Sequence, residues 1–138
     1  MKVGLVTDRR GTPLAVATDA ASVAEVVLGP AVLAGIPPGV WVPWGTPVLA
    51  DRGYDSDPLR AALAAAGFEL LAPHRKGRVR PPANDGRRMR RYKRRYVVER
   101  AFAWVKSFRR VATRYEYHVT LFDGFVSLAC AFIALSRL

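Results

Sequence analysis

The segment RRMRRYKRRYVVERAFAWVKSFRR, from Arg87 to Arg110, dominates this chain of 138 residues. It contains neither glycine nor proline and is rich in arginine, lysine, alanine and aromatic residues, a composition that predicts a helix of about six turns. Seven residues make almost two helical turns, so Tyr92, Glu99 and Lys106 are expected on one face. Arg95 lies one turn before Glu99. The pattern therefore places a single acid among a phenol and two cations.

Positive charge is concentrated in this part of the chain. Residues 74–114 contain 16 Lys or Arg and two acids, which gives +14, while the remainder contains six basic and nine acidic residues, which gives −3, for a total of +11. Such a concentration indicates a polyanionic partner, nucleic acid above all. The alternative interpretation is a solvated helix with a basic flank. A neighbouring apolar stripe of Val98, Phe102 and Val105 is expected to dock the helix on a core.

The first third of the chain predicts a hairpin followed by a helix. Two β-rich runs, Lys2–Thr7 and Thr12–Thr18, flank a turn that begins at Asp8. Ser22 is expected to cap a helix that is broken or bent at Gly29–Pro30. With the later elements, this order predicts a mixed α/β layer architecture in one domain. Those later elements are a strand at Thr46–Ala50, a helix capped within residues 55–57 and ending at Gly67, a strand at Phe68–Ala72, a basic loop at Pro73–Gly86 and a last apolar helix at Phe122–Leu135.

The single cysteine, the N-terminal sequence and the apolar runs argue against a disulfide-linked, secreted or membrane-spanning protein. Cys130 has no partner for an internal disulfide, and its apolar surroundings predict a core position. No signal-peptide pattern is present at the N-terminus. The run Phe125–Leu135 is too short to cross a bilayer. We therefore expect a soluble cytoplasmic protein.

Two acids are candidates for chemistry. Asp51 directly follows the predicted strand Thr46–Ala50, and ligands bind at the carboxyl ends of strands in open α/β sheets. A turn aspartate is the alternative role for Asp51, and a surface ion pair with Arg95 is the alternative for Glu99. Together, an acid at a strand end and one on an adjacent helix can bind Mg²⁺ through oxygen ligands. Such ions support phosphodiester chemistry beside a basic surface that holds DNA.

Two motifs resemble those of a known family. Residues 50–56 read ADRGYDS at a strand end, and the helix presents Tyr92, Arg95, Glu99 and Lys106 at spacings of three, four and seven residues. This order is similar to the DDE transposases of bacterial insertion sequences, whose signature is Tyr, two residues, Arg, three residues, Glu, six residues, Lys. The resemblance covers the C-terminal part of the family's catalytic domain.

The resemblance implies an RNase H-like fold, a mixed sheet flanked by helices, in which the first strand is lacking. It implies a DNA transposase that uses two Mg²⁺ or Mn²⁺ ions for phosphodiester hydrolysis and strand transfer at insertion-sequence ends. Asp51 and Glu99 would be the catalytic residues and metal ligands. The residues implied to contact DNA are Tyr92, Arg95 and Lys106, with Arg91 and Arg94 beside them.

One departure from the family pattern concerns the first catalytic aspartate. Its strand would precede Lys2, and Asp8 and Asp19 are better explained as a turn residue and a residue near a helix cap. We therefore expect residues 1–138 to form a single catalytic domain truncated at its N-terminus, with little strand transfer alone. Element ends and target DNA are the expected partners, with an upstream transposase polypeptide. Because transposition needs paired ends, a homodimer is a further expectation.

Two alternative functions stay open at this stage. The first is a non-catalytic transposase remnant that binds DNA through the basic helix and loop. The second is a basic RNA-binding protein of ribosomal type, which would account for the charge. The ribosomal alternative accounts for neither the aspartate block nor the spacing of the helical residues.

Overall fold

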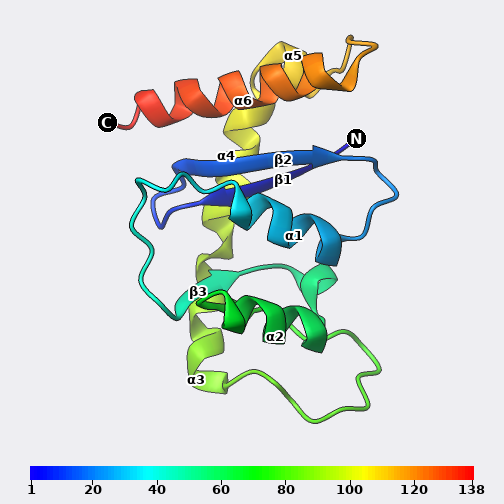
Figure 1. Cartoon of the computed structure of the whole chain (residues 1–138), viewed down its shortest axis with the longest axis vertical. Helices are drawn as coiled ribbons and strands as arrows, with labels where there is room; N and C mark the ends of the chain where they lie inside the picture. Colours follow the sequence, from blue (N-terminus) through cyan, green and yellow to red (C-terminus); the bar gives the residue numbers. More distant parts are fainter.

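A computed structural model describes all residues, 1–138, and confirms the mixed α/β architecture (Figure 1). Four short strands alternate with helices, among them two short 3₁₀ helices labelled η. No helix combines the length and the apolar character that crossing a membrane requires. The elements are β1 (Lys2–Thr7), β2 (Pro13–Asp19), α1 (Glu25–Ala34), β3 (Thr46–Leu49), η1 (Arg52–Tyr54), α2 (Asp57–Ala65), β4 (Phe68–Leu71), α3 (Gly86–Met89), η2 (Arg90–Arg95), α4 (Tyr96–Lys106), α5 (Arg109–Ala112) and α6 (Val119–Leu135).

The strands form two separate two-stranded sheets instead of one. β1 and β2 make the predicted antiparallel hairpin, in which Leu5 pairs with Val16. Asp8 builds the turn, because its Oδ1 accepts hydrogen bonds from the backbone N–H groups of Arg10 and Thr12, both at 2.8 Å. β3 and β4 pair in parallel, with Val48 opposite Leu70. Each of the four strands therefore has one edge without a hydrogen-bonded neighbour, β1 and β3 among them.

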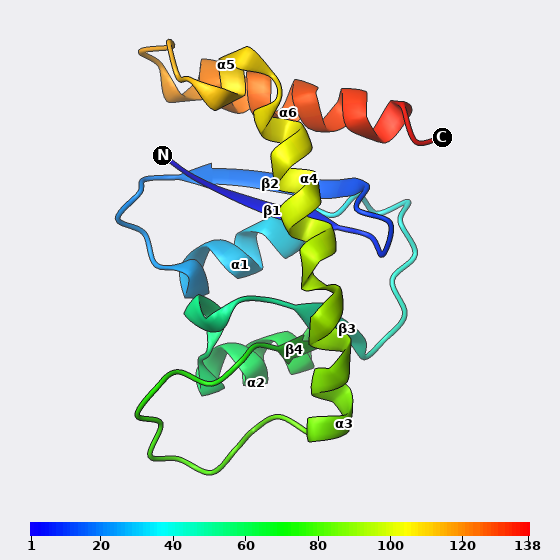
Figure 2. The ribbon, with the colours of Figure 1, turned by 180° about the vertical axis from the view of Figure 1, so that it is seen from behind.

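Helices cover both faces of this arrangement. α1 lies against the hairpin and α2 against β4, on the side that faces the viewer in Figure 1. Seen from behind, α3, η2 and α4 form one column that passes both sheets (Figure 2). η2 contacts β3, and α4 contacts β1. α6 lies against β2, on the face of the hairpin opposite to α1 (Figure 1).

Two hydrophobic cores correspond to the two sheets. One core is built around α6 and includes Phe122, Val126 and Cys130, as predicted for the cysteine. The other includes Leu63 and Leu70, between α2 and the parallel pair. The chain thus consists of two packed layers that share the α3–η2–α4 column.

The predicted six-turn helix from Arg87 to Arg110 is wrong as a continuous α-helix. It consists of α3, the 3₁₀ segment η2, α4 and, after an extended residue at Phe108, the short α5. Five of the six η2 residues are cations, and repulsion among like charges one turn apart disfavours regular α-helix there. The strand ends are also one residue shorter than expected, at Leu49 and Leu71.

The predicted docking stripe of α4 is likewise shifted. Val97, Ala101 and Val105 are buried, whereas Val98 and Phe102 are half-buried. Ala101 is fully buried, and its small side chain lets the helix backbone approach the hairpin closely. The helix therefore docks through Val105, as predicted, and through Val97 and Ala101 in place of the more apolar Val98 and Phe102.

Local capping signals were confirmed in α2 but not in α1. Ser56 caps α2 by accepting a hydrogen bond from the Leu59 N–H at 3.3 Å, and Gly67 ends it with φ of +88°. The expected cap at Ser22 is wrong, because α1 begins at Glu25 without a side-chain cap and continues through Pro30.

Candidate active site and nucleic-acid interface

Asp51 ends the parallel pair, where the sequence predicted it. It is half-buried just after β3, and its Oδ1 accepts a hydrogen bond from the Gly53 N–H at 2.9 Å. This bond makes Asp51 the N-cap of η1. The turn role of Asp51 is therefore present, and its other carboxylate oxygen has no hydrogen-bond partner in the chain.

A second carboxylate that the sequence did not indicate lies beside Asp51. A methyl group built on Gly53 would be 3.0 Å from Asp51 Oδ1 and 3.2 Å from Glu25 Cδ, so both carboxyl groups flank this glycine. Lys2 Nζ binds Glu25 at 2.9 Å, and this hydrogen bond lowers the pKa of Glu25. Burial, and then the charges of Asp51 and Glu25, raise the pKa of Tyr54. An acid in the first turn of α1 was the only signal for Glu25 in the sequence.

Tyr92, Arg95 and Glu99 form one connected row. Arg95 Nη1 donates to the Tyr92 hydroxyl at 3.3 Å, and Arg95 Nη2 is 3.2 Å from Glu99 Oε1. In a 3₁₀ helix residues three apart are eclipsed, and in an α-helix residues four apart are neighbours. The change of helix type at Tyr96 therefore keeps all three side chains on one face. Lys106 ends α4 and is exposed.

The structure does not gather these acids into a metal centre. No group of three or more His, Cys, Asp or Glu side chains is arranged to hold a metal ion. Glu99 is paired with Arg95 and its side chain is 58% exposed. η2, not α4, contacts the strand that leads to Asp51. Alone, the residues of this chain do not fit a complete metal site.

A row of unpaired cations follows the same helical column. Arg87, Arg90, Arg91, Lys93 and Arg94 are exposed, and none of them makes a salt bridge. Close cations without acidic partners attract the phosphates of a nucleic acid. The column is therefore a candidate nucleic-acid interface.

Asp55 is a buried acid that binds side chains and backbone from several segments. The sequence indicated it only as one possible helix cap. Its side chain is 3% exposed, and its Oδ1 accepts a hydrogen bond from Arg60 Nη1 at 2.6 Å. Its other oxygen accepts the backbone N–H of Arg75 at 2.6 Å. His74 Nδ1 is 3.1 Å from Asp55 Oδ1, and His74 Nε2 accepts from the Ala83 N–H at 3.1 Å, so Nδ1 is the donor to Asp55. We call Asp55, Arg60, His74 and Arg75 the Asp55 cluster.

The Asp55 cluster fixes the start of the predicted basic loop at Pro73–Gly86. Burial by itself raises the pKa of Asp55, but the hydrogen bonds from Arg75, Arg60 and His74 outweigh it, so this pKa lies well below its usual value. Nearby, Arg78 makes two hydrogen bonds to Asp57, at 3.0 and 3.1 Å. The loop therefore returns to the start of α2.

Comparison with protein families agrees with these motifs. The model of the transposase DDE domain matches residues 1–133. A protein from Burkholderia cepacia, named as a transposase for insertion sequence element IS402, is 34% identical over 97% of this chain. A protein from Brucella ovis, named as a transposase for insertion sequence element IS6501, is 41% identical over 64% of this chain.

The chain is shorter than the Burkholderia relative. It spans 62% of the Burkholderia protein, and the aligned part covers 66% of the Brucella protein. No solved structure matches the chain.

Proposed function

The chain belongs to the transposase DDE domain family, and from this premise we propose that it is part of a DNA transposase acting at the ends of an insertion sequence. The proposed reactions are phosphodiester hydrolysis at the element end and strand transfer to target DNA. One observation carries the proposal: Asp51 ends a strand that η2 contacts, and the same helical column presents the row Tyr92, Arg95 and Glu99.

In this proposal Asp51 and Glu99 each contribute a carboxylate to a site for Mg²⁺ or Mn²⁺. Such ions, when bound, stabilise the attacking and leaving oxygens of a phosphodiester. Residues 1–138 bring no three acidic side chains together for a metal ion, and in this proposal a third carboxylate comes from another segment. The chain's own basic side chains, Arg95 among them, would bind and orient the DNA backbone.

The free sheet edges support an additional strand as the source of that carboxylate. β1 pairs only with β2, and β3 only with β4. Figure 2 shows β1 and β3 as the strands of the two pairs that lie nearer to each other. Unpaired edges are templates for a further strand. We propose that a strand from an upstream polypeptide joins the two pairs into one mixed sheet, which would give an RNase H-like fold.

A nicking assay tests this proposal. The candidate polypeptide is to be sought in the DNA upstream of the coding sequence, read in all frames. We expect the two polypeptides together to nick DNA that carries the element ends, only with Mg²⁺ or Mn²⁺, and EDTA to stop the reaction. The chain alone should give little nicking. Absence of metal-dependent nicking by the assembled pair would contradict the catalytic function.

The unpaired cations favour a second candidate function, DNA binding without catalysis. Replacing Arg91 and Arg94 by Gln should lower the slope of log affinity against log salt by about 2 and weaken binding roughly fiftyfold at about 0.1 M salt. Titration of labelled duplex DNA at several salt concentrations measures both quantities.

A matched pair of substitutions controls for net charge. Arg9→Gln with Arg10→Gln removes two exposed charges from the hairpin turn, outside the row of unpaired cations, and should leave the slope unchanged. Both substitutions keep the backbone carbonyl of Arg10 that Arg100 of α4 binds at 3.3 Å. Equal effects of both pairs would show that binding depends on net charge and not on this interface.

A further inference from the structure

α6 carries two apolar stripes, and only one of them faces the core. The inner stripe is buried and includes Phe122, Val126, Ala129 and Ile133. The other, which we call the outer stripe, repeats at intervals of four, three, four and three residues, the spacing of a helix–helix seam. Its members are Leu121, Phe125, Leu128, Phe132 and Leu135.

The outer stripe is open to solvent along most of its length. Leu121, Leu128, Phe132 and Leu135 are 55, 52, 55 and 65% exposed. A helix that is apolar on two sides is expected to be covered on both. Contiguous apolar side chains at this exposure therefore mark an interaction surface.

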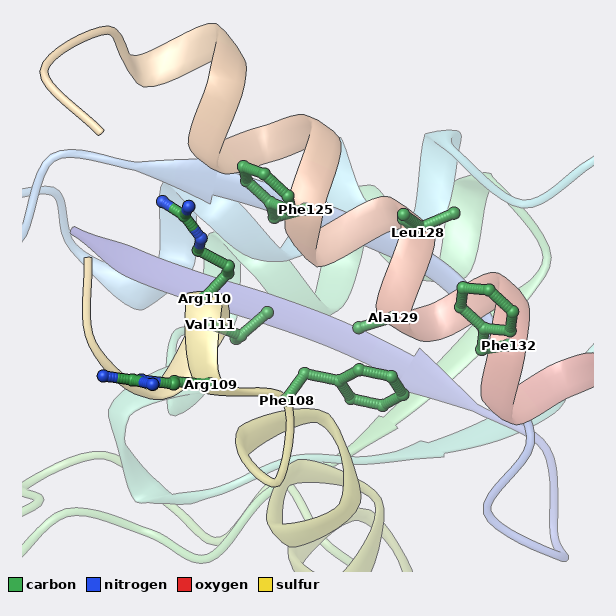
Figure 3. A pocket seen from close by; sticks show the side chains of 8 residues that line it. All are labelled: Phe108, Arg109, Arg110, Val111, Phe125, Leu128, Ala129 and Phe132. Carbon is green, nitrogen blue, oxygen red and sulfur yellow. The ribbon is translucent and has the colours of Figure 1, made fainter. Parts of the chain in front are cut away.

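A shallow groove lies along the outer stripe (Figure 3). Phe108 and Val111 form its second wall, and a volume of about 150 Å³ lies between the walls. Figure 3 shows the rings of Phe108 and Phe132 side by side, and their centroids are 6.3 Å apart. Since six of the eight lining residues are apolar, the groove suits an aliphatic or aromatic side chain from another molecule.

The accessible surface of the chain is also larger than a compact monomer requires. It measures 8930 Å² for a mass of 15.2 kDa, whereas a folded monomer of this mass exposes about 7,100 Å². Only 20 of 138 residues are buried. The excess accessible surface is therefore available to be buried when the chain associates with another molecule.

We propose that the outer stripe is a dimer interface, occupied by the outer stripe of a second copy in antiparallel orientation. Read from either end, the stripe is Leu, Phe, Leu, Phe, Leu, with Leu128 at its centre. A two-fold axis at Leu128 places Leu121 opposite Leu135 of the second copy. It also brings Phe125 to within one residue of Phe132 of the second copy, since these lie three and four residues from Leu128. Each position thus meets, or lies within one residue of, a residue of its own kind, as a closed symmetric interface requires.

Size and charge fit this occupant. A half-exposed side chain of this size presents roughly 100 Å², so the four half-exposed members of each of the two stripes would together bury about 800 Å² before Phe125 and the flanks are counted, which approaches the lower bound of about 1,000 Å² for a specific interface. The two cations that line the groove are not a barrier. Arg110 is paired with Glu116 at 2.9 Å and lies over the Phe125 ring at 5.5 Å, and the Arg109 side chain points away from Phe108 and Phe132 (Figure 3). The proposal does not depend on catalysis.

Light scattering after size exclusion tests the dimer on the full chain. We expect a mass of twice 15.2 kDa and, for Leu128→Glu, the monomer mass, with self-association weakened by about a hundredfold or more. Ser127→Glu adds the same charge at an exposed position of α6 outside the outer stripe and should stay dimeric. A monomeric wild-type chain, or equal effects of the two variants, would overturn the proposal.

Cysteine cross-linking tests the orientation without relying on a destabilising variant. Leu128→Cys should form a disulfide with itself, and Leu121→Cys only when mixed with Leu135→Cys. In an antiparallel pair two Leu121 positions are about 20 Å apart, too far for a disulfide. The wild type is the blank, because burial raises the pKa of the Cys130 thiol to about 11 and leaves it unreactive. Cross-linking of Leu121→Cys with itself would overturn the antiparallel arrangement.

Discussion

Replacing Asp51 by Asn or Glu99 by Gln is expected to lower metal-dependent nicking by the assembled transposase roughly a thousandfold or more. Metal ligands supply several kcal/mol of transition-state stabilisation, and each 1.4 kcal/mol is about a factor of ten in rate. Both substitutions keep the shape of the side chain, and the Asn amide oxygen can still accept the Gly53 N–H that Asp51 binds at 2.9 Å. Initial rates of nicking with and without Mg²⁺ measure the effect.

Asp8→Asn and Asp19→Asn are the matched controls for this prediction. Both remove a carboxylate near a strand end, and the turn bonds of Asp8 to Arg10 and Thr12 can be made by an amide oxygen. We expect both controls to nick at the wild-type rate. Full activity of Asp51→Asn and Glu99→Gln would remove the proposed roles of these two acids, whereas loss of activity in Asp8→Asn or Asp19→Asn would assign that residue to the site.

Replacing Asp55 by Asn is expected to reduce the free energy of unfolding by about 3 kcal/mol at pH 7. The carboxylate is 3% exposed, and the Arg60 side chain that it binds is 12% exposed. The substitution leaves this largely buried cation with only the more exposed Asp57, 3.3 Å away, as an acidic partner. Denaturant unfolding measures the change, and trypsin should cut the released basic loop faster at Arg75.

The same substitution should remove part of the acid sensitivity of the protein. Because the pKa of Asp55 is lowered in the folded state, its contribution is present above the unfolded pKa of about 3.9 and is lost as the pH falls through the folded value. The wild type should therefore lose more stability than Asp55→Asn between neutral pH and pH of about 3. Glu69→Gln, which breaks only a surface pair with Arg88, should cost less than about 1 kcal/mol. An Asp55→Asn chain as stable as the wild type would refute the role of the Asp55 cluster.

Much of the chain follows from short-range patterns. The hairpin around Asp8, a helix cap within residues 55–57 and the helix end at Gly67 were predicted because each depends on the chemistry of a few adjacent residues. The helical row was predicted by spacing alone, since Tyr92, Arg95 and Glu99 are one turn apart.

What the sequence determined by itself is therefore local: the hairpin turn, the cap and end of α2, and the helical spacing of Tyr92, Arg95 and Glu99. Only the tertiary structure decided that the strands form two pairs with free edges, that η2 interrupts the basic helix, and that the outer stripe of α6 stays uncovered. It also decided that Asp55 binds the backbone of Arg75, 20 residues away. Contacts of this kind depend on the path of the chain between the two residues. The free energy of packing selects that path, and no local sequence pattern encodes it.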